Sequence, residues 1–439
     1  MIPQWVIEKK RDKEELSEEE IREFINRYTD GTIPDYQMAA MAMAIYLNGM
    51  SFHETAWLTD AMMHSGRVLD TSFLPVPRAD KHSTGGIGDK VSLVLAPLVA
   101  CCDIAVPMIS GRGLGITGGT LDKMESIPGY RVGLSEEEFF NVLREHGVSM
   151  IGQTAEVAPA DKKLYALRDV TATVPSIPLI TASIMCKKLA EGIDALVLDI
   201  KWGSGAFMKN KEDARILAKS MVEVGTRMGK QVRAVLSDMN QPLGRTAGNA
   251  VEVVEAVESL QGNGPHDFME VTFSLCAHML LMTEKANSEE EARTILQGHI
   301  TSGAAFRKFK DMVRAHHGDD SVLDDLSRLP QAESTRDIRA ASAGTITRVD
   351  ADRIGRGVLL LGAGRQKTSD EVDHAVGVSN LVKIGEAVQA GDRLLTIHTN
   401  PESKLDEANA LFAEAIEIST QRVDPPQLIN EIILPETGA

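Results

Sequence analysis

Residues 80–89 read DKHSTGGIGD and residues 110–130 read SGRGLGITGGTLDKMESIPGY, and these two glycine-rich segments decide the fold. The intervening pattern predicts a helix over 90–101 and a buried strand over 104–109, and Thr120 begins another short helix. Glycines allow close approach of the backbone to a ligand. Helix N-termini present unpaired N–H groups and a positive dipole end. Two glycine loops that each begin a helix therefore predict a cradle for one anion, such as phosphate.

Cationic and hydroxyl side chains accompany both loops, and neither loop has the Walker sequence or fits the dinucleotide fingerprint well. His82 lies beside Lys81 in the first loop. A lone histidine is usually structural, but a general acid must lie within hydrogen-bonding reach of the leaving group, and a place next to phosphate favours that role. The predicted phosphate-binding residues are Lys81, Ser83, Ser92, Ser110 and Thr120.

Longer stretches carry a family resemblance. With the two loops, residues 151–188 (IGQTAEVAPADKKLYALRDVTATVPSIPLITASIMCKK) and 203–208 (GSGAFM) resemble thymidine phosphorylases and the related pyrimidine-nucleoside phosphorylases. The resemblance runs from KKRD at 9–12 into the C-terminal part. It implies reversible phosphorolysis of a pyrimidine 2′-deoxynucleoside, giving free base and 2-deoxy-α-D-ribose 1-phosphate, in a homodimer. Phosphate is then a substrate, and no cofactor or metal is expected at the reacting centre.

A second group of side chains lies in residues 160–190. Ser183 and Lys187 are four apart and share one helix face, and Arg168 precedes them. On spacing alone, a plain surface trio is the better interpretation. The resemblance instead assigns Arg168, Ser183, Lys187 and Tyr165 to base binding. It also implies that His82, Arg168 and Lys187 neutralise or protonate the departing base.

Three positions depart from the pattern of many relatives. Bacterial pyrimidine-nucleoside phosphorylases usually have lysine at the position of Met108, where it engages a ribose 2′-OH, and thymidine phosphorylases have methionine. Methionine offers no hydrogen bond to a 2′-OH, so 2′-deoxynucleosides are the expected substrates. Many relatives also have histidine at Ile116. Isoleucine neither donates a hydrogen bond nor titrates, and the sequence offers no physical explanation for this change.

The same relatives bind a potassium ion through a threonine at the position of Lys90 and a glutamate at Glu255. We expect the Lys90 ammonium to replace this cation and to pair with Glu255, so that no potassium is required. A solvated Lys90 unrelated to Glu255 is the open alternative.

Composition restricts the function classes. The formal charge of −17 argues against nonspecific nucleic-acid binding, which needs a basic surface. No apolar run approaches the ~20 residues of a membrane helix, and the N-terminal residues do not resemble a signal peptide. The four cysteines lack CxxC spacing, which is typical of reduced thiols in a cytoplasmic protein. No nucleic-acid or membrane partner is expected.

The fold class expected is α/β, with a small helical domain, a large α/β domain with a mixed sheet, and a C-terminal α+β domain. The helical domain combines residues 1–66 with 160–191. The α/β domain combines 67–159 with 192–330, because strands and helices alternate there. Residues 336–439 form the third domain.

Local patterns add detail to this plan. Ser17 and Ser51 are each followed three residues later by glutamate, a capping-box pattern. In the C-terminal part, β-branched runs predict strands over 344–349, 357–361 and 393–397, before a closing helix over 404–415.

Three alternatives to a thymidine phosphorylase remain. The nearest is a pyrimidine-nucleoside phosphorylase that also accepts uridine. The second is an anthranilate-type phosphoribosyltransferase, which needs magnesium on a pyrophosphate, although no paired acidic motif is placed for it. The third is an inactive nucleoside-binding protein, which retention of His82, Arg168, Ser183 and Lys187 disfavours. For the phosphorylase, closure of the cleft is expected near Gly66, Gly152 and Gly192.

Overall fold

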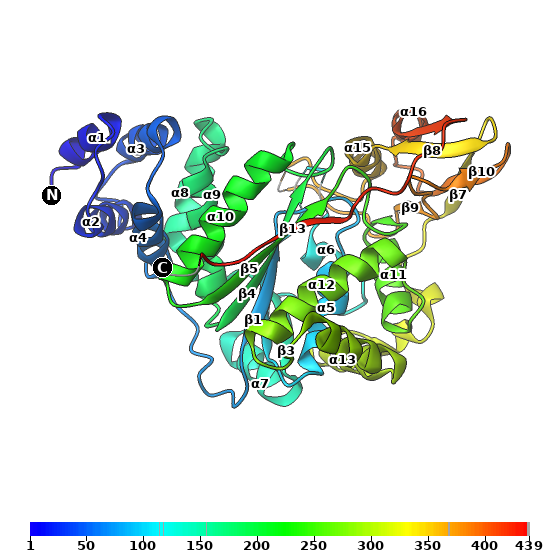
Figure 1. Cartoon of the computed structure of the whole chain (residues 1–439), viewed down its shortest axis with the longest axis horizontal. Coiled ribbons are helices and arrows are strands. Elements are labelled where there is room, and N and C mark those ends of the chain that lie inside the picture. The colour runs from blue at the N-terminus through cyan, green and yellow to red at the C-terminus, as the bar shows by residue number, and fades with distance from the viewer. Residues whose placement is uncertain (114, 117, 155, 368, 437–439) are drawn as a thin grey trace.

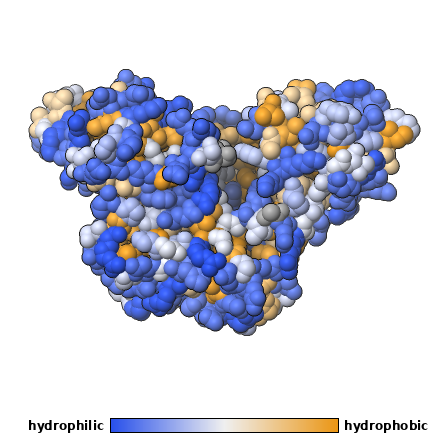
Figure 2. Space-filling model, turned by 180° about the vertical axis from the view of Figure 1, so that it is seen from behind, coloured by the Kyte–Doolittle hydropathy of each residue, from blue (hydrophilic) through white to orange (hydrophobic). Residues whose placement is uncertain are grey.

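The computed structural model describes residues 1–113, 115–116, 118–154, 156–367 and 369–436. In Figure 1 a group of helices lies at one end, a twisted sheet at the centre and a smaller β-rich part at the other end. Leu114, Thr117, Ala155 and Thr368 lie outside the described residues. Figure 2 shows the surface hollowed between the two upper lobes.

The helical part joins two distant pieces of chain. Helices α8 and α9 return to pack on α2, α3 and α4. The capping boxes at Ser17 and Ser51 are both present. Glu54, the N3 residue of the second box, also accepts hydrogen bonds from Lys10 Nζ at 2.6 Å and from the backbone N–H of Leu16 at 2.9 Å. The bounds are α1 (Pro3–Arg11), α2 (Glu18–Thr29), α3 (Asp35–Asn48), α4 (Phe52–Met63), α8 (Pro159–Val170) and α9 (Ile177–Leu189).

The central sheet has the order β1-β4-β5-β13. The first three strands are parallel and β13 is antiparallel, so the sheet is mixed, as expected. Strands β2 and β3 form a parallel pair beside β1, linked through the bridge between Arg78 and Ala105. The bounds are β1 (Ala79–Ser83), β2 (Val106–Ser110), β3 (Val148–Gly152), β4 (Ala195–Trp202), β5 (Gln231–Asp238) and β13 (Ile429–Ile433).

Both faces of this sheet are buried. Along β4, Val197 belongs to the core shared with α5 and α12, whereas its neighbours Leu196 and Leu198 belong to the core shared with α9 and α10. Alternation along a strand sends successive side chains to opposite faces, so a continuous apolar run is required here. The other helices are α5 (Val91–Ala100), α6 (Thr120–Glu125), α7 (Glu136–His146), α10 (Lys211–Arg227), α11 (Ala250–Leu260), α12 (His266–Met282), α13 (Glu289–Thr301) and α14 (Ala304–Ala315).

The C-terminal part contains two small sheets, β6-β9-β11-β7 and β10-β8-β12. Two connections cross the expected boundaries: β13 pairs with β5 of the central sheet, and β6, which precedes α11, pairs with β9. The bounds are β6 (Ala247–Gly248), β7 (Ser334–Arg339), β8 (Gly344–Val349), β9 (Gly377–Ser379), β10 (Ala387–Val388), β11 (Arg393–Thr399), α16 (Leu405–Ala415) and β12 (Ile416–Ser419).

The strand predicted over 357–361 is wrong, because these residues form the end of helix α15 (Ala351–Leu361). The Asp350 side chain caps the helix by accepting hydrogen bonds from the backbone N–H groups of Asp352 and Arg353. Ile354 and Leu361 are buried on its inner face. Val358 is the one β-branched residue of this run, and its three leucines favour the helix that Asp350 caps upstream.

Candidate functional site at the carboxyl ends of β1, β2 and β3

A pocket of about 280 Å³ opens where three parallel strands end. Residues that follow β1, β2 and β3 form most of its wall, and α9 supplies Ile184, Lys187 and Lys188. The crevice outside the carboxyl ends of strands is the usual ligand site of open α/β sheets. Of the predicted residues, the pocket brings together Lys81, His82, Ser83, Ser92, Ser110, Thr120 and Lys187.

The first glycine loop is held close against the rest of the domain. Gly88 has φ +73°, and a Cβ there would lie only 2.4 Å from the carbonyl oxygen of Leu243. Ser83 Oγ accepts a hydrogen bond from the N–H of Gly85 at 3.1 Å and donates one to Asp89 Oδ2 at 2.5 Å. Helix α5 starts directly after this loop, so Ser92 lies in its first turn. The loop thus presents a helix N-terminus and hydroxyls to the pocket.

The second glycine loop is organised by Asp122. Its Oδ2 accepts a hydrogen bond from the N–H of Gly113 at 2.7 Å, and its Oδ1 accepts one from Arg365 Nη1 at 2.7 Å. A Cβ on Gly119 would lie 2.0 Å from the nitrogen of Gly113, so only glycine fits this close approach. Thr120 is the first residue of α6. A carboxylate from α6 and an arginine from the C-terminal part therefore shape the second side of the cradle.

The charges of the pocket are mostly positive, with one carboxylate among them. Asp89 Oδ1 lies 3.6 Å from Lys81 Nζ, and Asp89 Oδ2 lies 3.9 Å from Lys201 Nζ. Burial opposes ionisation of Asp89, but the two ammonium groups and the Ser83 hydroxyl outweigh it and hold its pKa well below the usual range.

His82 is half-buried at the pocket wall. Burial lowers the pKa of His82 well below its ordinary value, and the ammonium groups of Lys188, Lys81 and Lys187 lower it further. Its imidazole is therefore neutral at neutral pH, with one N–H available as a hydrogen-bond donor. A bound anion would offset these cations and favour the protonated form.

Lys187 reaches the pocket from the helical part. Its ammonium group donates hydrogen bonds to Asp161 Oδ2, across the α8–α9 interface, and to Ser183 Oγ at 3.2 Å, one turn earlier on α9. Asp161 and Ser183 are both buried. Partners on two helices thus hold the ammonium group of Lys187 at the wall of the pocket.

Arg168 is placed differently. Its guanidinium donates to the carbonyl oxygens of Leu179 at 3.0 Å and Val174 at 2.7 Å, and only 1% of the residue is exposed. These bonds hold the turn between α8 and α9, and Arg168 is not in the pocket lining. Tyr165 is exposed, with its ring centroid 5.9 Å from the Arg168 guanidinium. Of the four residues assigned to the base, Lys187 alone lines the pocket.

Met108 and Ile116 also lie away from this lining. Met108 is 1% exposed within β2, where its backbone pairs with that of Met150. Ile116 packs partly buried against the core, near Gly355 of the C-terminal part.

Lys90 is fully buried, and its ammonium group donates to Glu255 and to the carbonyl oxygens of Leu243 at 2.9 Å and Thr246 at 3.5 Å. The predicted pairing of Lys90 with Glu255 is therefore present in the structure.

Sequence reasoning missed the roles of Asp89, Arg112 and Lys188, which also line the pocket. Asp89 is the last residue of the first glycine-rich segment and Arg112 lies inside the second, so their positions in the sequence indicated a place in the pocket. Lys188 adjoins Lys187, but two of its partners, Asp80 and the carbonyl oxygen of Ile109, lie on strands far away in the chain.

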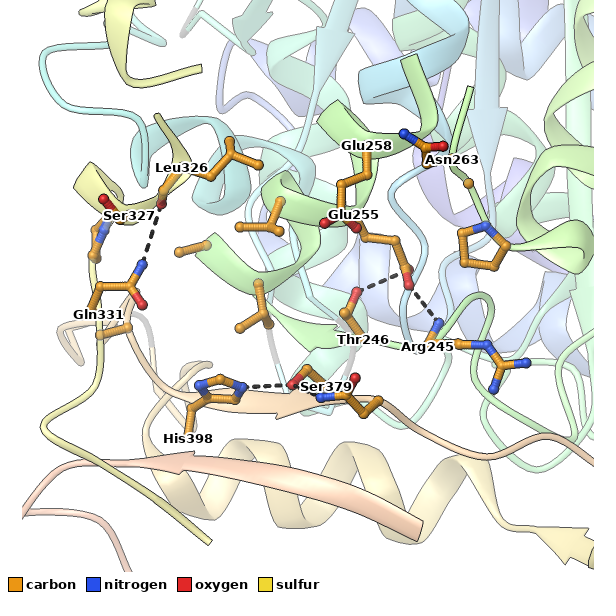
Figure 3. Close-up of a pocket in the computed structure, with 18 residues that line it drawn as sticks. Arg245, Thr246, Glu255, Glu258, Asn263, Leu326, Ser327, Gln331, Ser379 and His398 are labelled. Carbon is orange, nitrogen blue, oxygen red and sulfur yellow. Dashed lines mark hydrogen bonds between the residues drawn. The ribbon is translucent and has the colours of Figure 1, made fainter. Parts of the chain in front are cut away.

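A second and larger hollow, of about 550 Å³, lies between α11 and the C-terminal strands β9 and β11. Figure 3 shows its polar side chains, with His398 Nε2 2.8 Å from Ser379 Oγ and Glu255 bonded to Thr246 and to the backbone of Arg245. The predicted phosphate and base residues do not line this hollow.

The matches to known protein families fall on the successive parts of the chain described above. Models of the glycosyl transferase family match at residues 4–66 (helical bundle domain) and 76–306 (a/b domain), and the pyrimidine nucleoside phosphorylase C-terminal domain matches at 345–419. The chain is 49% identical over 428 residues to the pyrimidine-nucleoside phosphorylases of Geobacillus stearothermophilus and Bacillus subtilis, covering 98% of this chain and 99% and 98% of theirs. The chain belongs to the pyrimidine-nucleoside phosphorylase family.

As a member of this family, the protein is an enzyme of the pentosyltransferase class. The fold is also shared with anthranilate phosphoribosyltransferase from Thermus thermophilus, at TM-score 0.58 and 19% identity, covering 71% of this chain and 99% of that one. In the described part of the chain, no helix has the length and apolar character needed to cross a membrane. The described residues also contain no group of three or more His, Cys, Asp or Glu arranged to hold a metal ion.

Proposed function

We propose that this phosphorylase cleaves thymidine and deoxyuridine reversibly with inorganic phosphate, releasing the free base and 2-deoxy-α-D-ribose 1-phosphate. The observation that carries the proposal is a single pocket with two kinds of wall. One wall is built from Lys81, Ser83, Ser110 and Thr120 on two glycine loops, and the other holds Lys187 on α9. The similarity to pyrimidine-nucleoside phosphorylases over nearly the whole chain supports the same chemistry.

In this mechanism phosphate lies against the first turns of α5 and α6. One of its oxygens attacks C1′ from the face opposite the base, forming a C–O bond while the glycosidic C–N bond breaks. The base leaves with the electron pair, and His82 and Lys187 stabilise its negative charge through hydrogen bonds. Positioning of phosphate and stabilisation of this developing charge supply most of the rate enhancement.

Arg168 has a supporting role in this proposal. Its contacts to the carbonyl oxygens of Val174 and Leu179 fix the turn that precedes α9. That turn sets the position of Ser183 and Lys187, so Arg168 acts on the base through them unless closure of the cleft exposes it. Closure by hinge motion near Gly66, Gly152 and Gly192 is part of the proposal.

To test the proposal, the release of thymine from thymidine is measured with and without phosphate. Release that requires phosphate and proceeds in a metal chelator supports the phosphorylase. A requirement for magnesium would instead favour a phosphoribosyltransferase, and the absence of turnover an inactive nucleoside-binding protein. Comparable turnover of uridine would indicate the broader pyrimidine-nucleoside phosphorylase.

We also propose a homodimer in the cytoplasm. Helices α1 and α3 pack together at the outer end of the helical part and expose Trp5, Tyr36 and Leu47 at 63%, 74% and 71%. Several large apolar side chains exposed on one pair of helices are a surface that a subunit interface could cover. The four cysteines are free thiols, which suits a reducing compartment.

A further inference from the structure

A closed group of charged side chains lies directly behind the pocket. Asp80 precedes Lys81 on β1, Lys188 follows Lys187 on α9, and Glu191 lies where the chain leaves α9 for β4. Asp80 and Glu191 have no exposed surface, and Lys188 is 5% exposed. The group therefore connects the strand that carries Lys81 and His82 to the helix that carries Lys187.

Lys188 uses all its donors inside this group. Its Nζ donates to Asp80 Oδ2 at 2.6 Å, to the carbonyl oxygen of Ile109 at 2.7 Å and to Glu191 Oε1 at 2.8 Å. An ammonium group has three N–H donors, so none remains for another partner. Glu191 Oε1 also accepts from the N–H of Ile109 at 3.2 Å. Three elements, β1, β2 and the end of α9, are tied together by one lysine and one carboxyl group.

The other oxygen of each carboxyl group has no donor. Asp80 Oδ1 and Glu191 Oε2 are both buried without a hydrogen-bond partner. The two carboxyl groups lie within hydrogen-bonding reach of one another, but two carboxylates are both acceptors and cannot bond. If both were ionised, the group would also carry a net negative charge with no access to water, which is costly.

One proton on this pair of carboxyl groups would supply the missing hydrogen-bond donor and remove the net negative charge. Burial raises the pKa of Glu191 well above its ordinary value, and the neighbouring carboxylate of Asp80 adds to the effect, while Lys188 opposes it. The other nearby cations are already matched: Lys81 faces Asp89, and Lys187 is bonded to Asp161. They do not supply the missing donor.

We propose that Glu191 is protonated at neutral pH and donates this hydrogen to Asp80, and that the resulting neutral Asp80–Lys188–Glu191 group positions Lys81 and His82 opposite Lys187. Lys188 borders the pocket, but all its donors are used inside the group, so we treat the three residues as positioning residues. The kinetic part of this inference rests on the proposed phosphorolysis, whereas the protonation state does not. The charge of Lys188 also bears on His82, whose pKa it lowers.

The test compares Glu191→Gln with Glu191→Ala, because an amide supplies the N–H donor of the protonated acid without a charge. Glu191→Gln should retain the thermal stability of the wild type and its kcat within about twofold. Glu191→Ala should lower kcat by about 100-fold, the scale expected when reacting groups are misplaced. If Glu191 is ionised, the glutamine variant would lose a partner of Lys188 and would be as impaired as the alanine variant, which would overturn the proposal.

Infrared spectroscopy gives a readout that is independent of activity. The wild type at neutral pH should show a protonated carboxyl C=O band that disappears in Glu191→Gln. The matched control is Glu255→Gln, which removes a buried carboxylate that is paired with Lys90 and should leave this band unchanged. Absence of the band in the wild type contradicts the inference. Its presence in a protein that fails to cleave thymidine would leave the inference standing and refute the proposed function.

Discussion

The ammonium group of Lys90, a fully buried residue, donates a hydrogen bond to the carboxylate of Glu255. The same ammonium donates to the carbonyl oxygens of Leu243 and Thr246, in the segment that adjoins the first glycine loop through Gly88. The chain itself thus supplies a cation to a set of oxygen atoms. We expect this covalently attached ammonium to make an ion from solution unnecessary.

This arrangement predicts that activity is independent of potassium. The kcat/KM should be equal in potassium, sodium and choline chloride at matched ionic strength. The comparison variant is Lys90→Thr, which leaves Glu255 buried without its cation and should lose about 3–5 kcal/mol of stability. Potassium should restore part of that loss in the variant. A strict potassium requirement in the wild type would show the interpretation of Lys90 to be wrong.

His316 predicts an acid-sensitive contribution to stability. Its Nε2 lies 2.9 Å from Ser149 Oγ and accepts from the N–H of Met150, while Nδ1 lies 3.0 Å from the carbonyl oxygen of Arg131. Burial lowers the pKa of His316 from 6.5 to about 4. The folded state therefore favours neutral imidazole, and the unfolded state takes up a proton first. The resulting stabilisation is complete above pH 6.5 and is lost as the pH falls toward about 4.

The pKa shift of His316 sets an upper limit of about 3 kcal/mol on this contribution. Urea unfolding at a series of pH values measures it. The wild type should lose more stability than His316→Gln between neutral and acid pH, and the exposed neighbour His317→Gln should behave like the wild type. Equal slopes for all three proteins would contradict the assignment.

Sugar preference gives a third prediction. Met108 cannot donate a hydrogen bond, and it is buried in β2 rather than in the pocket lining. Methionine at position 108 gives a ribose 2′-OH no hydrogen bond, so we expect the kcat/KM for thymidine to exceed that for uridine by about tenfold or more. Initial rates over a range of each nucleoside at saturating phosphate measure the ratio. Similar values for the two nucleosides would refute the proposed preference.

Assembly is tested at the exposed face of α1 and α3. The wild type should behave as a dimer in light scattering coupled to gel filtration. The double variant Trp5→Glu with Leu47→Glu should be monomeric, because charged side chains are disfavoured at the core of an interface. Phe207→Glu, an exposed apolar residue outside these helices, is the control. A monomeric wild type would exclude this interface.

Much of the fold follows from local sequence signals. The capping boxes of Ser17 and Ser51 are formed as their spacing predicts, and Ser135 forms another. The two glycine loops begin α5 and α6, because loop and helix are specified within a few residues of each other. The exception is 357–361, a leucine-rich apolar run with one β-branched residue that continues the helix capped by Asp350.

The contacts of the candidate site could not be predicted from the sequence where they depend on tertiary packing or on residues far apart in the chain. Arg168 donates to carbonyl oxygens of a turn whose shape depends on the packing of α8 against α9. Lys188 finds Asp80 across 108 positions of sequence, and a pattern confined to one segment cannot reveal such a pair. By contrast, Ser183 and Lys187 lie on one turn, and their 3.2 Å contact follows from spacing alone.

The most direct test of the central claim is phosphorus NMR of thymidine incubated with enzyme and inorganic phosphate. We expect the phosphate signal to be converted into 2-deoxy-α-D-ribose 1-phosphate in step with thymine release, and a His82→Asn variant to lose about 100-fold or more in rate. Thymine release without formation of the sugar phosphate, or no release at all, would contradict the proposal that phosphate held by the two glycine loops is the nucleophile.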